Sequence, residues 1–229
     1  MKRLFTLYLT IFLTWASFGQ NKIYIDEPFV GLPWRQTKVV EIDSLKQLPT
    51  RIPFIVSNLF KTSMTDFVNN IFFIKGQIID IESWATKDSA FQTEYKFVIP
   101  KYELFFELRD TLINIKSYCF RVSLDQYGQI TSFEWPREGF NKRADFVKGK
   151  VLKNEAVKYA VKKNYKTKSC MYDMKFDDYK QRLNWHISFL QKSTGDKFDF
   201  SKEYRTIVID AKSKFIIEEL ITESVGVSD

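Results

Sequence analysis

The sequence predicts an α+β fold in which antiparallel β-sheets are each packed by a helix. Strand-like alternation runs from Phe72 to Trp135, an amphipathic helix follows near residues 152–165, and further strands come after it. Aromatic residues make up 17% of the chain, and it has only 8 Gly and 6 Pro. This composition is typical of a chain with ample material for a packed core.

The N-terminal residues resemble a cleavable secretory signal. Lys2 and Arg3 precede an apolar run from Leu4 to Trp15, and small residues allow cleavage between Gly19 and Gln20. The apolar run is too short for a spanning helix, and no later segment is long and apolar enough to be one. We therefore expect residues 1–19 to be a signal peptide and the mature chain to be exported, either to the periplasm or out of the cell. Cleavage would leave 33 basic and 28 acidic residues, a formal charge of +5.

The segments after the signal predict a lead-in followed by an α+β half. Residues 20–50 are punctuated by proline and read as irregular, with room for one short strand or helix near residues 39–48. Residues 51–137 open with helical pieces before the alternating strands begin. In the clearest strand, Tyr118 to Leu124, apolar side chains fall on one face and polar ones on the other, and a tight turn at Asp125–Gly128 follows.

A polar segment at residues 138–150 predicts a linker between two halves, and residues 151–222 predict the second α+β half. Its strands are expected at about 170–176, 182–191, 204–210 and 215–221, with a frayed tail at 223–229. The pattern of strand, Asp and turn around Asp125 recurs around Asp210, which makes an internal duplication one interpretation and ordinary hairpin sequence the other.

Three lysines are candidate binding residues. Lys158, Lys162 and Lys166 follow one another at i, i+4 and i+8 and would form a stripe opposite the apolar side of the predicted helix. Such a stripe can contact an anionic partner, or it can simply be the solvated face of an amphipathic helix.

Residues 150–222 resemble a PepSY-like domain. The residues concerned are Glu155-Ala156 and Ala160 in the helix, the aromatic strand from Trp185 to Phe189, and the hairpin from Ile209 to Ile216. The resemblance implies a helix followed by an antiparallel sheet, with the first half of the chain as a candidate second copy. It also implies an extracytoplasmic module without catalytic residues, of a kind found beside peptidases.

Two positions depart from the PepSY-like pattern. Lys214 stands at the turn position where the family has Gly, so a positive φ there would cost about 1 kcal/mol. The helix also lacks the usual Ser or Thr cap, since Leu152 or Lys153 stands at that position.

The chain has two cysteines, Cys119 and Cys170. Export would allow them to form a disulfide that closes a loop of about 50 residues, and two free thiols are the alternative. No Cys-x-x-Cys spacing indicates redox chemistry.

The sequence offers little for catalysis. His186 is the only histidine, and the motifs of serine hydrolases, phosphate-binding loops and calcium loops are missing. We expect no cofactor, no metal and no nucleic-acid partner. The predicted function is an exported, non-catalytic binding or inhibitor-like module for a protein or peptide in the cell envelope, with a peptidase as one such partner. A structural component of envelope assembly is the alternative, and a hydrolase with an unrecognised site is third.

Overall fold

The computed structural model describes residues 39–80, 100–195 and 200–226. The expected signal peptide, most of the lead-in and residues 81–99 of the predicted strand region lie outside these residues. The helices and strands are β1 (Val39–Ile42), η2 (Leu45–Gln47), α2 (Arg51–Ser63), η3 (Thr65–Asn70), β2 (Ile71–Ile79), β3 (Tyr102–Asp110), β4 (Ile115–Leu124), β5 (Ile130–Phe133), η4 (Arg143–Asp145), α5 (Gly149–Lys162), β6 (Cys170–Asp177), β7 (Arg182–Gly195), β8 (Phe200–Asp210) and β9 (Ile216–Gly226).

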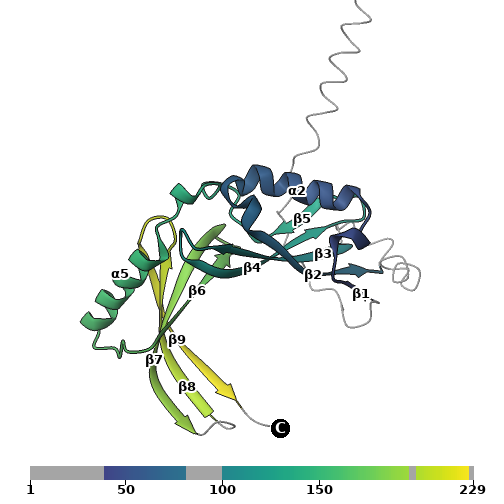
Figure 1. The fold of residues 1–229 in the computed structure, drawn as a ribbon. Helices are drawn as coiled ribbons and strands as arrows, with labels where there is room; N and C mark the ends of the chain where they lie inside the picture. The colour runs from purple at the N-terminus through teal and green to yellow at the C-terminus, as the bar shows by residue number, and fades with distance from the viewer. Residues whose placement is uncertain (1–38, 81–99, 196–199, 227–229) are drawn as a thin grey trace, which may run out of the picture.

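The predicted fold class is confirmed, because two antiparallel sheets are each contacted by a helix (Figure 1). The first sheet has the order β1-β2-β3-β4-β5 and the second has the order β6-β7-β8-β9. Among the described residues, each half therefore contains one α-helix followed by four strands in sequential order, and β1 adds a fifth strand to the first sheet.

The first sheet buries the face predicted from its alternation. Tyr118, Phe120, Val122 and Leu124 of β4 are all buried, and each lies opposite a buried residue of β3. Helix α2 covers this face, and the ring of Phe60 packs edge-on against the ring of Phe106 with centroids 4.9 Å apart. Such aromatic pairs add to the stability gained by burying the apolar surface.

Two hairpin turns are built in the same way. In the β4–β5 turn, the Asp125 carboxylate accepts backbone N–H bonds within the turn, and Gly128 has a φ of 83°. In the β8–β9 turn, the Asp210 carboxylate accepts such bonds, and Lys214 has a φ of 62°. Lys214 thus adopts the left-handed conformation that favours glycine.

Helix α5 packs one face of the second sheet. Leu152, Ala156 and Ala160 are fully buried in the core to which Trp185 and Phe189 of β7 also belong. The helix lies three residues earlier than the predicted range of 152–165. The helix stops earlier than predicted because the amides of Asn164 and Tyr165 bond to the carbonyls of Val161 and Ala160. Asn164 has a φ of 59°, so these residues form a Schellman motif that stops the helix.

The segment predicted as a polar linker is packed between the two halves. Phe140 and Phe146 are buried in a hydrophobic core that spans both halves. The Val147 amide bonds to the Ala211 carbonyl at 2.8 Å, and the Gly149 amide bonds to the Ile113 carbonyl at 3.1 Å. The linker prediction rested on the polar residues and glycines of this segment, whereas two aromatic side chains anchor it.

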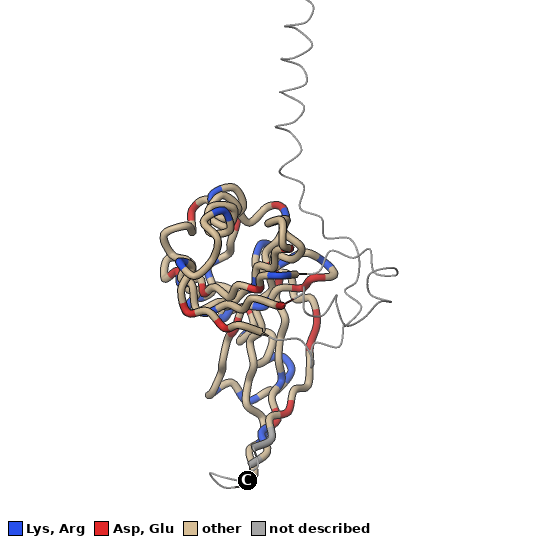
Figure 2. The backbone as a smooth tube through the Cα atoms, turned by 90° about the vertical axis from the view of Figure 1, so that its right-hand side faces the viewer, with Lys and Arg blue, Asp and Glu red and all other residues tan. Residues whose placement is uncertain are grey.

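The distal ends of β7, β8 and β9 project away from the rest of the molecule (Figures 1 and 2). Residues 192–195 of β7 and 221–224 of β9 are exposed there. The tail was predicted to fray from residue 223, but residues 223–226 belong to β9, which pairs with β8 as far as Gly226. The same ladder shows that the predicted strand at 215–221 was too short.

Candidate functional site: the end of α5 and the β9 edge

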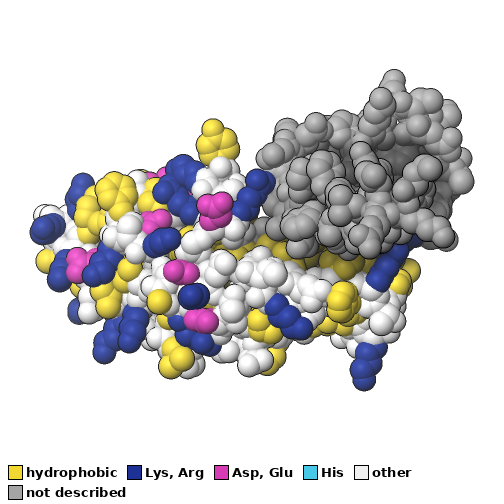
Figure 3. All heavy atoms as spheres, turned by 90° about the horizontal axis from the view of Figure 1, so that it is seen from above, with side chains coloured by type: hydrophobic (Ala, Val, Ile, Leu, Met, Phe, Trp, Pro, Cys, Tyr) yellow, Lys and Arg dark blue, Asp and Glu magenta, His cyan; other side chains and the backbone are white. Residues whose placement is uncertain are grey.

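The structure places the three predicted lysines in two different settings. Lys158 and Lys162 lie exposed on α5, and the Lys158 Nζ pairs with the Glu155 carboxylate at 2.9 Å. Lys166 lies beyond the end of the helix, so it does not continue the predicted stripe. Lysine side chains are nevertheless frequent on the surface on the α5 side of the molecule (Figure 3).

Lys166 is instead part of a tether between the α5 end and β7. Its amide donates to Oε1 of Gln191 at 3.0 Å, and its Nζ donates to the Gln191 carbonyl at 2.6 Å. The Gln191 side-chain amide donates back to the Lys166 carbonyl at 3.2 Å and to the Phe189 carbonyl at 3.0 Å. These bonds fix the chain where it leaves the helix.

The two cysteines are free thiols in the structure. Cys119 is exposed on β4, and Cys170 is half-buried at the start of β6 and packs against the core. Their thiols are not joined in the structure, and the disulfide stays a prediction.

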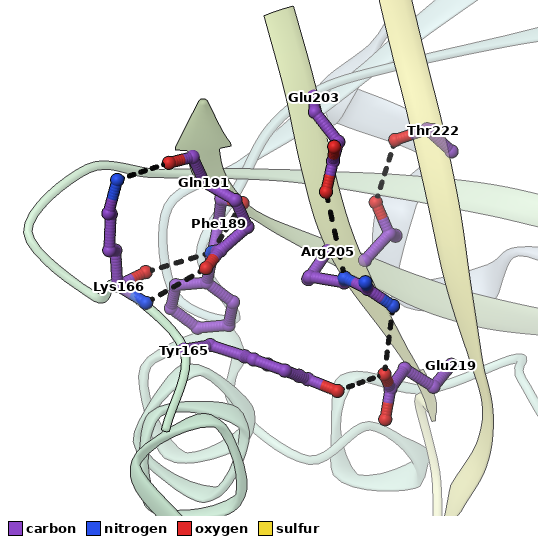
Figure 4. A network of polar contacts seen from close by, with 9 residues as sticks. Tyr165, Lys166, Phe189, Gln191, Glu203, Arg205, Glu219 and Thr222 are labelled. Atoms are coloured by element: carbon purple, nitrogen blue, oxygen red, sulfur yellow. Dashed lines mark hydrogen bonds and ion pairs between the residues drawn. The ribbon is translucent and has the colours of Figure 1, made fainter. Parts of the chain in front are cut away.

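A polar cluster joins the end of α5 to strands β8 and β9 (Figure 4). The hydroxyls of Tyr159 and Tyr165 both donate to the Glu219 carboxylate, the former at 3.3 Å. Arg205 Nη1 lies 3.8 Å from Glu219, and its Nε lies 3.9 Å from Glu203. The Arg205 guanidinium also lies over the Tyr165 ring, 5.5 Å from its centroid. We call Tyr159, Tyr165, Arg205 and Glu219 the clamp.

The clamp fixes the position of β9 relative to the helix. The hydrogen bond to Glu219, aided by burial, raises the pKa of Tyr165, so its hydroxyl stays protonated and remains a donor at neutral pH. Glu219 is the acceptor for both tyrosines and belongs to β9. The helix end and the last strand are thus held together by charge-assisted hydrogen bonds.

The other face of the second sheet carries His186. It lies opposite Asp173 of β6 and Val208 of β8 in the strand register. In the described part of the chain, His186 has no hydrogen bond to Asp173 or to Ser188, and the Ser188 hydroxyl instead bonds Thr206 at 2.8 Å. Burial and the nearby Lys175 lower the pKa of His186. These residues therefore do not form a Ser-His-Asp arrangement.

A shallow depression of about 350 Å³ lies on the surface of α5, lined by Val151, Asn154, Glu155, Val157 and Lys158. Among the described residues, no group of three His, Cys, Asp or Glu side chains could hold a metal ion.

The end strands of the two sheets differ in length and surroundings. β1 and β5 have four residues each, so they offer little edge. β6 lies beside β4 (Figure 1), where Lys116 of β4 is stacked over Tyr172 of β6, 5.2 Å from the ring centroid. β9 has eleven residues, no proline, and in the sheet order no strand beyond it.

β9 is also acidic in an overall basic chain. It carries Glu218, Glu219 and Glu223 and no Lys or Arg, whereas the full sequence has a formal charge of +7. Glu219 is used by the clamp, while Glu218 and Glu223 are exposed and form no ion pair with the described residues. Ile221, between them, is 60% exposed.

Sequence reasoning did not identify the clamp. Arg205 and Glu219 lie on separate strands whose register no local pattern fixes, and no pattern in the helix sequence singles out Tyr159. One signal was present, because Asn164 is a residue type that often adopts the left-handed conformation at a helix end. If Asn164 had been taken as the end of the helix, Tyr165 would have been expected to turn back toward the sheet.

Comparisons with known proteins give no relative for this chain. No family model matches it, and neither a curated protein nor a solved structure does. The described helices include none that is long and apolar enough to cross a membrane.

Proposed function

We propose that the protein is an exported, non-catalytic binding module that takes up an extended peptide segment as an added strand beside β9. The observation that carries the proposal is the β9 edge, because β9 is the one long end strand of the described sheets with no strand of the other sheet beside it. Adding a strand to such an edge satisfies the backbone N–H and C=O groups of both partners, and this gives affinity without a deep pocket.

The features of β9 argue against an edge that is merely protected. Proteins usually blunt exposed edges with short strands, proline, bulges or charged side chains, lysine above all. Of these devices β9 has one register shift near its start, opposite Val208 and Ile209, and three glutamates, but it is long and contains no proline or lysine. The clamp also holds it in place before any partner arrives, which lowers the entropic cost of binding.

Two features of the sequence support the location and the type of partner. The signal-like segment at residues 1–19 favours a partner in the cell envelope or outside the cell. The resemblance of residues 150–222 to PepSY-like domains favours an inhibitor-like role toward a peptidase. Under this proposal, an extended segment of the partner would occupy the β9 edge.

The proposal is tested with two proline variants in the exposed part of β9, Thr222→Pro and Glu223→Pro. Successive amides of a strand point to opposite sides, so one variant removes an outward N–H and the other removes a bond to β8. We expect the variant that keeps the wild-type circular dichroism spectrum to lose saturable binding of peptides from an envelope digest.

The matched controls are Thr131→Pro and Ser132→Pro, which place proline at the short β5 edge. The folded one of this pair should bind as the wild type does. Unchanged peptide binding by the folded β9 variant would overturn the proposal.

A second candidate, a component of envelope assembly, is favoured by the outer face of the first sheet. Phe72 and Ile74 of β2 are 49% and 43% exposed there. Deleting residues 20–38 would test whether the lead-in recruits a partner. The deletion should stop before β1, because Ile42 and Leu48 are buried in the core.

A further inference from the structure

We propose that the strand added beside β9 is basic, with Lys or Arg opposite Glu223 and opposite Glu218 and an apolar residue opposite Ile221. This inference rests on the proposed function and specifies the chemistry of the partner. It follows from the strand register, from the charges on β9 and from the pairing of Glu219 with Arg205 in the clamp.

Glu223 has no cation directly opposite it, because the residue opposite it on β8 is another glutamate. In this cross-strand row, Lys192 of β7 lies opposite Glu203 of β8, which lies opposite Glu223. Like charges directly opposite each other on neighbouring strands destabilise a sheet. Arg205 is near Glu203 and Glu219 but pairs with neither Glu223 nor Glu218. A basic residue on an added strand would lie directly opposite Glu223 and complete the row.

Glu218 has a similar place on the other face of the sheet. It lies opposite Val208, which in turn lies opposite His186. Burial, which disfavours the charged imidazole, lowers the pKa of His186, so this row supplies no cation at neutral pH. A basic residue on an added strand would lie directly opposite Glu218.

The spacing of these residues defines a motif for the partner. Side chains alternate along a strand, so Glu218 and Glu223 lie on opposite faces, about 17 Å apart along β9. Ile221 shares a face with Glu223 and is 60% exposed. An antiparallel partner runs opposite to β9, so its sequence would be basic-x-apolar-x-x-basic, with the first basic residue opposite Glu223 and the last opposite Glu218. A parallel partner would have the reverse order.

A second copy of β9 does not fit this edge. β9 contains no Lys or Arg, so pairing with another β9 gives its glutamates no cation in any register. Glutamates brought close to glutamates would also repel each other. The occupant is accordingly a basic segment of another protein.

The test uses three synthetic peptides of equal length and measures their binding by fluorescence anisotropy. The first contains Lys-Thr-Val-Thr-Thr-Lys, and the other two replace both lysines with Thr or with Glu. We expect the lysine peptide to bind about three- to tenfold more tightly than the threonine peptide, since each cross-strand charge pair contributes a fraction of a kcal/mol. Added salt should reduce this preference.

Two variants connect the preference to the strand. The double variant Glu218→Gln/Glu223→Gln should bind the lysine and threonine peptides equally, whereas Glu155→Gln, on α5, should keep the preference. Equal binding of these two peptides to the wild type would overturn the inference and leave the proposed function standing. Preference for the glutamate peptide would overturn the inference and point to the lysines of α5. Binding of none of the peptides would count against the proposed function as well.

Discussion

The hydroxyl of Tyr165, at the turn that ends α5, donates a hydrogen bond to the carboxylate of Glu219 in the edge strand β9. Three residues after the end of the helix, the chain thus contacts the outermost strand of the second sheet. Tyr159 reinforces the contact from within the helix. An edge strand that could fray on its own is in this way tied to a helix that packs on the sheet.

Replacing Tyr165 by Phe should loosen β9 selectively. The variant keeps the ring under Arg205 but removes the donor to Glu219, so β9 amides should exchange with deuterium faster while those of β3 and β4 do not change. Tyr179→Phe is the matched control, because Tyr179 is 95% exposed. Equal exchange in β9 for both variants would contradict the role of the clamp.

Replacing Asp110 by Ala should destabilise the protein by about 3 kcal/mol, because it breaks a buried ion pair and leaves turn amides unsatisfied. The Asp110 carboxylate is buried, accepts from Arg143 Nε at 2.7 Å, and also accepts from the Leu112 amide at 3.0 Å. Urea unfolding measures the loss. Lys158→Ala, at an exposed pair, should change the free energy of unfolding by less than about 0.5 kcal/mol. Similar losses in the two variants would refute the importance of the Asp110–Arg143 pair.

Replacing Lys214 by Gly should stabilise the protein by about 0.5–1 kcal/mol. Lys214 has a φ of 62°, and glycine relieves the strain of that conformation while adding some entropy to the unfolded chain. Lys212→Gly is the control, because Lys212 donates to the Gly139 carbonyl and should lose stability on truncation. A lower urea midpoint for Lys214→Gly would show that the turn is not strained.

The predictable part of the fold was the part that depends on local pattern. The alternation from Tyr118 to Leu124 identified a buried strand face. The positive φ at Lys214 was expected only from the resemblance to PepSY-like domains, which have Gly at that turn position. Boundaries set by tertiary contacts were missed. Nothing in the sequence of residues 138–150 shows that Phe140 and Phe146 find a shared core, or that β9 continues to Gly226.

The candidate site was predicted less well than the fold. The lysine stripe assumed that helical spacing holds as far as Lys166, next to the predicted helix end at Tyr165, whereas the left-handed Asn164 ends the helix at Lys162. The clamp and the acidic edge depend on which strands pair and in which register. These are non-local properties, and charge and spacing along the chain do not determine them.

His186 predicts a pH dependence of stability. Burial and Lys175 lower its pKa below the ordinary 6.5, while Asp173 and Glu218 oppose the shift. The unfolded chain therefore binds the proton more readily, and stability should fall as the pH drops from about 6.5 toward the lower folded-state pKa. His186→Gln should flatten this part of the curve of unfolding free energy against pH. An unchanged slope would contradict the prediction.

The most direct test of the central claim is amide hydrogen exchange of the protein with and without the lysine peptide. If β9 is the binding edge, its amides should become protected when the peptide is added, while those of β1 and β5 should exchange as before. Protection confined to α5 or to the first sheet, with β9 unchanged, would contradict the claim.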